Sequence, residues 1–365
     1  MPGAQTTARR PEVRPKMEGR KIKAAVLHGI NDLRIEEVEM PKITRDDEVL
    51  IRIRAVGVCG SDIHYYREGR IGPFVVKEPL ILGHESAGEV VEVGGAVKHL
   101  KPGDKVAIEP GVGCRRCEFC HEGRYNLCPE EAFMATPPVH GAFVEYVVWP
   151  ADFVFKLPPE IPFEAGALCE PLAVALQAIK QGNPKPGARV AILGAGPIGL
   201  AILQASLAYG ASEVYVTDVY PLRLEKAKEM GATEAINAKE SDPVEAILDL
   251  TNGRGADVVY EAAGSVVTQR QAFRIVKSGG TIVLVGMTAE EENTVPLLDL
   301  ICREYEVKGV LRYANTYPQA VALTASGKVN LLPMVTHRFP LDKAREALEL
   351  ADTQKDKAIK VMVEV

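Results

Sequence analysis

The sequence lacks a long apolar run, a basic stripe, internal repeats and low-complexity segments. Its apolar stretches, such as 190–193, fall far short of the roughly 20 residues that a membrane helix needs, so we expect a soluble protein without a membrane partner. The 365 residues carry 49 acidic and 43 basic groups, a formal charge of −6, which argues against nucleic acid as a partner. The composition, 47% apolar, is that of a globular protein, and the length of 365 residues suggests about two domains.

Residues 1–20 form a basic extension that we expect to be disordered. Residues 1–23 hold seven basic and two acidic groups, so the rest of the chain carries a charge of −11. The extension has no apolar segment of the secretory kind, and Pro11 and Pro15 would interrupt the helix of a mitochondrial presequence. A targeting role is the alternative.

The seven cysteines are unevenly distributed. Four lie within fifteen residues, and Cys59, Cys169 and Cys302 are isolated. This spacing argues against a secreted disulfide framework and favours metal binding in a reducing compartment, so we expect a cytoplasmic protein.

The chain alternates between two textures. Between about 21 and 152, short strand-like runs interrupted by Gly and Pro predict an irregular antiparallel β domain. After a proline-rich boundary at 158–187, short apolar strands alternate with helices, which predicts a parallel sheet covered on both faces. The predicted strands are 49–56, 88–93, 105–108, 143–148, 189–193, 213–217, 257–260, 281–285 and 358–365, and the clearest helices are 197–209 and 222–230.

A glycine-rich turn joins the first predicted strand of the parallel sheet to its first helix. In the segment 194–199, Gly194 permits a tight turn, Gly196 lets the backbone approach a pyrophosphate, and Gly199 lets helix and strand pack closely. Together with Pro197 and Ile198, these residues predict a dinucleotide site with its phosphates at the helix N-terminus.

Asp218 ends the second predicted strand, 24 residues after Gly194. A carboxylate there accepts hydrogen bonds from the adenosine ribose and repels a 2′-phosphate, which predicts NAD rather than NADP. Arg223 complicates this prediction, because a guanidinium can stack on adenine or accommodate a phosphate. The alternative for Asp218 is that it caps the helix that starts near Pro221.

One cysteine cluster has the composition of a structural zinc site. Cys114, Cys117, Cys120 and Cys128 supply four thiolates, which satisfy tetrahedral zinc and leave no open position. Free thiols, a regulatory disulfide and an iron–sulfur cluster are the alternatives.

A second, scattered group offers mixed ligands on loops flanked by glycine. Cys59, His84 with Glu85, and Glu170 supply one sulfur, one imidazole and carboxylate oxygens. Three such ligands plus water make an open, catalytic zinc site.

These motifs together resemble the zinc-dependent medium-chain dehydrogenase family. The resemblance rests on Cys-Gly-Ser-Asp-x-His at 59–64, Gly-His-Glu at 83–85, the four-cysteine cluster and Gly-Ala-Gly-Pro-Ile-Gly at 194–199. More narrowly, the chain is similar to the polyol branch, the sorbitol dehydrogenases and their xylitol and arabinitol relatives. The segments that carry this narrower match are 135–138, 170–173, 294–298, 311–316 and 335–340.

The resemblance implies an α/β fold in which one domain is inserted in another. A GroES-like, mostly-β catalytic domain would comprise residues 21–172 and 311–365, and a Rossmann domain with a doubly wound parallel sheet would comprise residues 173–310. The resemblance also implies one catalytic and one structural zinc. It places Glu170 as the third ligand of the catalytic zinc; Glu85 would ligate directly, ligate through water or orient His84. Cys169 and Cys302 are left as packed thiols.

The implied reaction is reversible oxidation of a polyol to a ketose with hydride transfer to NAD. Ser61 and His64 lie where the family's proton relay would lie, with an exposed loop histidine as the alternative for His64. Val285 and Met287 would contact the cofactor. The residues that the resemblance suggests for substrate binding are Tyr65, Phe133, Thr136, Glu170, Arg312 and Tyr313.

Two other functions remain open from the sequence. A relative acting on butanediol, a simple secondary alcohol or threonine would use the same zinc and cofactor. A non-catalytic NAD(P)H-binding protein would need no catalytic zinc. The family also implies a homo-oligomer, by default a tetramer.

Overall fold

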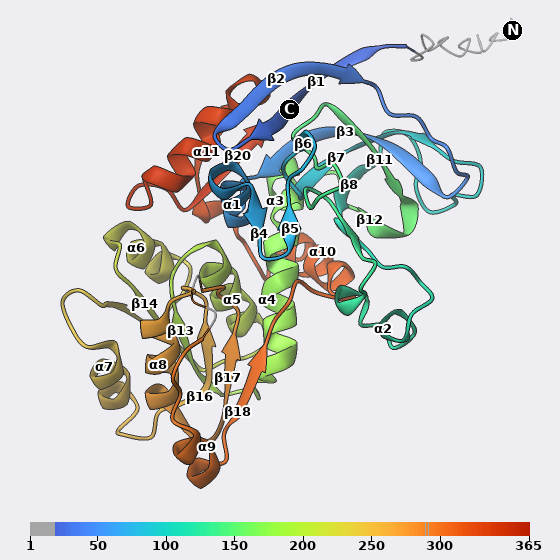
Figure 1. The fold of residues 1–365 in the computed structure, drawn as a ribbon. Coiled ribbons are helices and arrows are strands. Elements are labelled where there is room, and N and C mark those ends of the chain that lie inside the picture. The colour runs from blue at the N-terminus through green and yellow to red at the C-terminus, as the bar shows by residue number, and fades with distance from the viewer. Residues whose placement is uncertain (1–18, 289, 291) are drawn as a thin grey trace, which may run out of the picture.

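The computed structural model describes residues 19–288, 290 and 292–365. Nearly all of the predicted basic extension lies outside these residues. Two sheets dominate the described chain (Figure 1). The first has seven strands in the order β12-β8-β7-β3-β20-β19, with β11 also paired to β3. Its strands are β3 (Glu48–Gly57), β7 (Glu85–Val93), β8 (Lys105–Ile108), β11 (Tyr146–Pro150), β12 (Val154–Lys156), β19 (Val335–Pro340) and β20 (Lys360–Glu364).

The seven-stranded sheet joins segments from the two ends of the described chain. β20 pairs antiparallel with β3, placing Met362 opposite Gly57, and β19 pairs parallel with β20. Figure 1 shows this as red strands beside blue ones. Because β7 also pairs with β3, the residues around Gly57, Glu85 and Lys360 meet at one end of these three strands.

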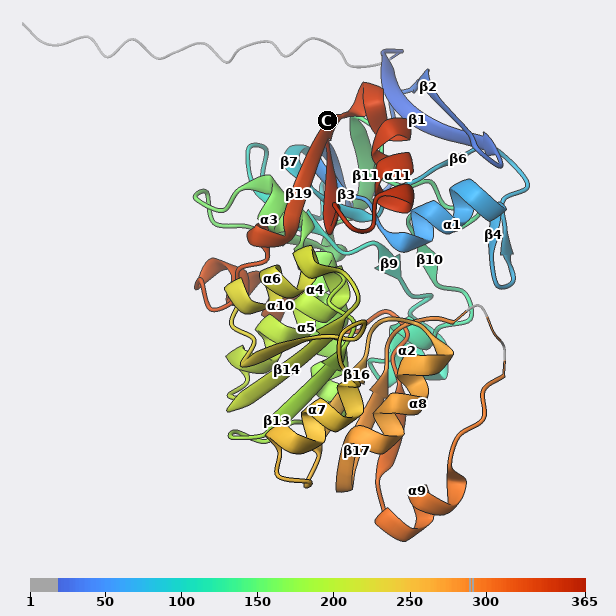
Figure 2. The same cartoon turned by 90° about the vertical axis from the view of Figure 1, so that its left-hand side faces the viewer.

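The second sheet has six parallel strands in the order β15-β14-β13-β16-β17-β18. Alternate residues of β13 point into different cores: Val190 and Ile192 into one, Ala191 and Leu193 into the other. Helices α4 and α5 fill the first core and α7 and α8 the second, so both faces are covered, as the apolar strands predicted (Figure 2). The strands are β13 (Arg189–Leu193), β14 (Glu213–Asp218), β15 (Glu234–Asn237), β16 (Ala256–Glu261), β17 (Val276–Leu284) and β18 (Glu306–Gly309).

The remaining elements are helices and short ribbons. The helices are α1 (Gly60–Glu68), α2 (Glu118–His121), α3 (Phe163–Ala167), α4 (Cys169–Gly182), α5 (Pro197–Ala208), α6 (Pro221–Glu229), α7 (Pro243–Leu250), α8 (Val266–Ile275), α9 (Leu297–Arg303), α10 (Tyr317–Ala325) and α11 (Ala344–Thr353). The ribbons are β1 (Lys21–Gly29) with β2 (Asp32–Glu39) and β6 (Leu80–Ile81), β4 (Arg70–Ile71) with β5 (Phe74–Val75), and β9 (Gly111–Val112) with β10 (Ala132–Phe133). None of the described helices is long and apolar enough to cross a membrane.

Each predicted strand overlaps an observed one, and β8 and β13 match their predicted bounds. The run at 143–148 was placed too early, because β11 begins at Tyr146. Sequence reasoning missed α4, which contains Pro171, because proline in a boundary region indicates a turn. Pro171 lies in the first turn of α4, where its missing N–H leaves no helical hydrogen bond unmade.

Candidate active site

Three of the predicted metal ligands lie together. The Sγ of Cys59, a ring nitrogen of His84 and a carboxylate oxygen of Glu85 all lie within 4.8 Å of one another. Cys59 is the N-cap residue of α1, and Glu85 is the first residue of β7, directly after His84. His84 and Glu85 are buried and Cys59 is half-buried, so solvent reaches the group on the side of Cys59.

Asp62 fixes the two segments that carry these ligands. Its carboxylate is fully buried and accepts the backbone N–H of Cys59 at 2.9 Å and that of Gly83, also at 2.9 Å. The same carboxylate lies 3.9 Å from Nδ1 of His84. Asp62 therefore holds the two backbone segments in place and puts a negative charge close to the imidazole, as carboxylates near metal-bound histidines do. Sequence reasoning missed this role, although Asp62 lies within the motif at 59–64.

The acidic groups around His84 favour positive charge at this position. Burial lowers the pKa of His84, but the neighbouring thiolate of Cys59 and the carboxylates of Asp62 and Glu170 outweigh burial and raise it to about 10. A sulfur, an imidazole and a carboxylate are also ligands that zinc accepts at catalytic sites. The donor set and its charge thus fit zinc.

Lys360 is a buried cation beside the same group. Its Nζ lies 2.7 Å from each carboxylate oxygen of Glu85 and donates to the backbone oxygen of Val58 at 3.0 Å. Both side chains of the pair are only 2% exposed. Gly57 leaves room for this arrangement, because a Cβ there would lie 2.0 Å from Oε2 of Glu85. Sequence reasoning missed Lys360; the signal was a lysine directly before the apolar run 361–363.

Glu170 lies in the first turn of α4 and is buried, but it is not in the group of three ligands within 4.8 Å. Its Oε1 accepts a hydrogen bond from the Tyr313 hydroxyl at 2.8 Å, and burial raises its pKa to about 7.

The two isolated cysteines differ in burial. The Cys169 thiol is buried 3.5 Å from the Ala165 oxygen, as predicted. The prediction for Cys302 was wrong: it lies exposed on α9 because that short helix buries none of its residues.

The two predicted relay residues both lie on α1. Ser61 is half-buried in the first turn. The His64 side chain is 53% exposed and its Nδ1 bonds Oε1 of Glu68 at 3.0 Å. The structure thus leaves His64 at the surface and does not bring it against the metal-ligand group.

The four cysteines of the second predicted site come together around α2. Their sulfur atoms all lie within 4.8 Å of one another. The backbone N–H of Cys114 donates to the Cys128 sulfur and that of Arg115 to the Cys120 sulfur, each at 3.3 Å. A further backbone N–H, that of Arg116, lowers the pKa of the Cys114 thiol to about 7. Burial acts the other way on Cys120 and Cys128 and raises the pKa of both thiols, that of Cys120 to about 12. Four sulfur atoms at this spacing fit a closed tetrahedral zinc site, in which the metal would stabilise the thiolates.

The glycine-rich turn has the geometry that a dinucleotide needs. Gly194 has φ +106°, in the region that favours glycine. A Cβ on Gly199 would lie 1.8 Å from the Gly194 oxygen, whereas one on Gly196 would meet only Arg223, at 3.8 Å. Gly196 therefore leaves the backbone open at the N-terminus of α5, where Pro197 and Ile198 begin the helix.

Asp218 ends β14 beside this turn. Its Oδ2 accepts the Ala195 N–H at 2.7 Å, and its Oδ1 accepts those of Val219 and Tyr220 at 2.7 and 3.0 Å. Tyr220, rather than Asp218, is the N-cap residue of α6. Nη1 of Arg223 lies 3.8 Å from Oδ2, so the positive guanidinium lies beside the Asp218 carboxylate.

Val285 and Met287 follow β17 at the same edge of the sheet. The Val285 N–H donates to the Glu261 oxygen at 2.8 Å, so it continues the strand pairing into the loop. Met287 is 68% exposed, and its backbone oxygen packs against Gly264. An apolar side chain left in water at the end of a parallel strand is available to a cofactor.

Phe133 lies against the metal-ligand group, and contacts link it to three other predicted substrate residues, Arg312, Thr136 and Tyr65. The centres of the Phe133 and His84 rings lie 5.4 Å apart. Phe133 also contacts Arg312, whose guanidinium carbon lies 3.8 Å from the centre of the Phe133 ring. Nη2 of Arg312 reaches Oγ1 of Thr136 at 3.5 Å. Tyr65 is buried, which raises its pKa, while its hydrogen bond with Thr136 and the charge of Arg312 act to lower it.

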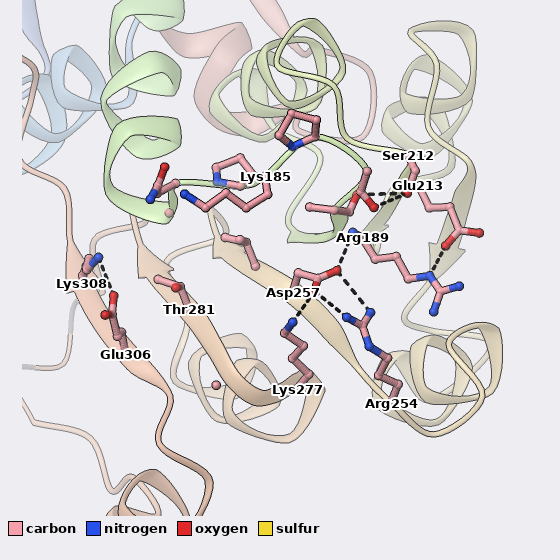
Figure 3. Close-up of a pocket in the computed structure, with 18 of the residues that line it drawn as sticks. Lys185, Arg189, Ser212, Glu213, Arg254, Asp257, Lys277, Thr281, Glu306 and Lys308 are labelled. Carbon is pink, nitrogen blue, oxygen red and sulfur yellow. Dashed lines mark hydrogen bonds and ion pairs between the residues drawn. The ribbon is translucent and has the colours of Figure 1, made fainter.

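A cavity of about 930 Å³ lies elsewhere. It opens at the amino ends of the parallel strands, and none of the predicted site residues lines it. Its charged side chains pair with one another: Figure 3 shows Arg254 and Lys277 directed at Asp257 and Arg189 directed at Glu213. The site is therefore assigned from its chemistry rather than from cavity size.

Comparison with known proteins identifies the family. Residues 45–159 match the alcohol dehydrogenase GroES-like domain and residues 197–326 match the zinc-binding dehydrogenase domain. Sorbitol dehydrogenase of Bacillus subtilis is 47% identical over 94% of this chain and 97% of its own length. The chain belongs to the zinc-dependent medium-chain dehydrogenase family, in its polyol branch.

Two further relatives extend this comparison. Human sorbitol dehydrogenase is 47% identical over 89% of this chain and 91% of its own length. A crystal structure of a zinc-binding dehydrogenase from Sinorhizobium meliloti bound to NADP has a TM-score of 0.89 at 32% identity, covering 95% of this chain and all of that one. The family membership confirms the predicted α/β fold, with its GroES-like and Rossmann parts.

Proposed function

We propose that this protein oxidises a secondary alcohol of a neutral polyol, of the sorbitol, xylitol or arabinitol class, to a ketose with hydride transfer to NAD. The observation that carries the proposal is the meeting of Cys59, His84 and Glu85 beside Phe133 and Arg312. A metal-ligand group next to an aromatic face and a multiple hydrogen-bond donor suits a substrate that has one reacting hydroxyl and several others to anchor.

The metal-ligand residues would hold zinc, which when bound lowers the pKa of a ligated alcohol toward neutrality. Asp62 keeps the His84 imidazole directed at that position. Lys360 holds the Glu85 carboxylate and balances its charge. Glu170, held by Tyr313, remains a candidate ligand or a partner of bound water, and Ser61 and His64 would pass the alcohol proton toward solvent.

Asp218 and the glycine turn support NAD as the cofactor. With Oδ2 bonded to the Ala195 N–H, Asp218 is held rigidly where the adenosine ribose would lie. A carboxylate fixed in that place repels a 2′-phosphate. Arg223 lies 3.8 Å from the same carboxylate and lessens this repulsion, so we expect the preference for NAD over NADP to be incomplete.

We propose the division predicted above, with residues 21–172 and 311–365 as the catalytic domain and 173–310 as the coenzyme domain. The four cysteines would hold the structural zinc. We also propose a homo-oligomer, a tetramer as in the wider family, located in the cytoplasm. Leu297, Leu298 and Ile301 on α9 are 62–72% exposed near the open edge strand β18, which supports association through this edge.

The test is a rate panel on the purified protein. Sorbitol, xylitol, arabinitol, 2,3-butanediol and threonine are each offered with NAD and with NADP, alongside zinc analysis. We expect two zincs per chain and the highest kcat/KM for a polyol with NAD. Cys59→Ser should lose activity and one zinc, whereas the control Cys302→Ser should lose neither. Higher rates on butanediol or threonine would refute the substrate class, and no turnover with one zinc would favour a non-catalytic role.

A further inference from the structure

Arg312, part of the proposed substrate wall, forms an ion pair with Glu131, a buried acid that has no role in the reaction described above. Nη1 of Arg312 donates to Oε2 of Glu131. The Glu131 side chain is 5% exposed and that of Arg312 is 21% exposed. Because Arg312 stacks on Phe133, and Phe133 contacts the His84 ring, the pair is one aromatic ring away from the proposed zinc ligands.

The pair is built into the fold. Arg312 has φ +50°, a left-handed conformation that a non-glycine residue keeps only when its surroundings hold it. The segment containing the four cysteines holds both sides of it. Three hydrogen bonds do so: Nδ2 of Asn126 donates to the Leu311 oxygen at 2.8 Å, Nδ2 of Asn315 to the Gly123 oxygen at 2.6 Å, and the Asn315 N–H to the Tyr125 hydroxyl at 2.8 Å.

Glu131 also has a place prepared for it. A Cβ on Gly111 would lie 2.6 Å from Oε1 of Glu131 and 3.0 Å from the Phe133 ring. Glycine at this position of β9 therefore lets the carboxylate and the ring lie side by side beneath Arg312. Burial raises the pKa of Glu131 to about 7, although the charge of Arg312 and its hydrogen bond act to lower it, so the carboxylate is charged above that pH.

The charge balance decides what such a wall can bind. An unpaired arginine beside a substrate attracts carboxylates and phosphates, which it binds in bidentate fashion. Paired with Glu131, the same guanidinium still has N–H donors for hydroxyl oxygens but brings no net charge. The carboxylate also repels any anionic group that approaches Arg312.

We propose that Glu131 is a specificity-determining residue that restricts the site to uncharged polyols and excludes polyols carrying a carboxylate or phosphate. It acts by positioning and neutralising Arg312. This inference rests on the proposed function, because it assumes that Arg312 faces the substrate.

The test compares Glu131→Gln with Glu130→Gln. The neighbouring Glu130 is 56% exposed and pairs with the exposed Arg116, so its variant removes the same charge away from the site. The kcat/KM for sorbitol and for sorbitol 6-phosphate is measured for each protein. We expect the ratio to move at least about tenfold toward the phosphate in Glu131→Gln, which corresponds to about 1.4 kcal/mol. Wild type and Glu130→Gln should not differ, and the KM for NAD should not change.

A second measurement does not depend on turnover. Gluconate is added to each NADH-loaded protein and the melting temperature is recorded, with sorbitol as the uncharged ligand. Gluconate should stabilise Glu131→Gln but not wild type, and Glu131→Asp, which keeps the charge, should behave as wild type. Equal responses of wild type and Glu131→Gln to gluconate would overturn the inference, even if sorbitol is oxidised. Failure of wild type to oxidise any polyol would instead refute the proposed function.

Discussion

Replacing Lys360 by methionine removes the cation that faces Glu85 while keeping a side chain of similar length. Both partners are 2% exposed, and Nζ lies 2.7 Å from each carboxylate oxygen. Removing one member of a buried pair leaves an uncompensated charge and costs about 3–5 kcal/mol. For a unit of 150–250 residues, 1 kcal/mol shifts the melting temperature by about 2–4 °C, so the zinc-free variant should melt at least about 6 °C below the zinc-free wild type.

The same substitution should cost less when zinc is bound, because the metal would take over the charge of the Glu85 carboxylate. The assay is a melting curve of each protein after chelation and after zinc reconstitution. Lys23→Met is the matched control: Lys23 pairs with Asp342 at 3.0 Å, but the two side chains are 55% and 57% exposed. Exposed pairs contribute about 0–1 kcal/mol, so this control should shift little in either state. An equal loss in Lys360→Met with and without zinc would refute the reasoning.

Three further predictions address the cofactor, the cysteine cluster and a buried acid. Asp218→Ala should raise the KM for NAD at least about tenfold and lessen the preference over NADP, because the carboxylate would contact the ribose in the proposed site; steady-state rates with both cofactors test this, and an unchanged preference contradicts it. Cys117→Ser should lose one zinc by metal analysis and lower the melting temperature, whereas Cys302→Ser should do neither. Burial raises the pKa of Glu109 to about 8 in the folded state, above its usual 4.5, so folding favours its protonated form. Wild-type stability should therefore fall as pH rises from about 5 to 8 relative to Glu109→Gln, and parallel denaturation midpoints of the two proteins would disprove this.

The parallel sheet and its cofactor turn could be predicted from local sequence. Buried strands of a sheet covered on both faces are apolar throughout, and the glycines at 194–199 have steric reasons that a short segment contains. Sequence reasoning missed the short strands β15 and β18, because their mixed polar and apolar sequences have no such pattern. Sequence reasoning also missed helix α4, because Pro171 was interpreted as part of a domain boundary rather than as a residue of the first helical turn.

Sequence reasoning named the three residues of the metal-ligand group, together with Glu170, which lies outside that group, but it missed the charged side chains that hold them. Asp62 lies beside Cys59 in sequence, yet its role depends on a bond to Gly83, from another segment. Lys360 meets Glu85 only because β20 pairs with β3. Glu131 gains its partner through the turn at Arg312. Each depends on contacts between distant segments, which no local motif encodes.

The pairing of β20 with β3 also bears on the order in which the protein assembles. Cys59, His84 and Glu85 are synthesised early, but Lys360 follows only after the whole six-stranded sheet has been made. Until β20 arrives, Glu85 lacks its cationic partner and the end of β3 at residues 55–57 has an open edge. Such long-range pairings are slow because the intervening loop must first close. A nascent chain that has completed its cofactor-binding sheet would still expose its metal ligands, so zinc supply during synthesis should affect the yield of folded protein.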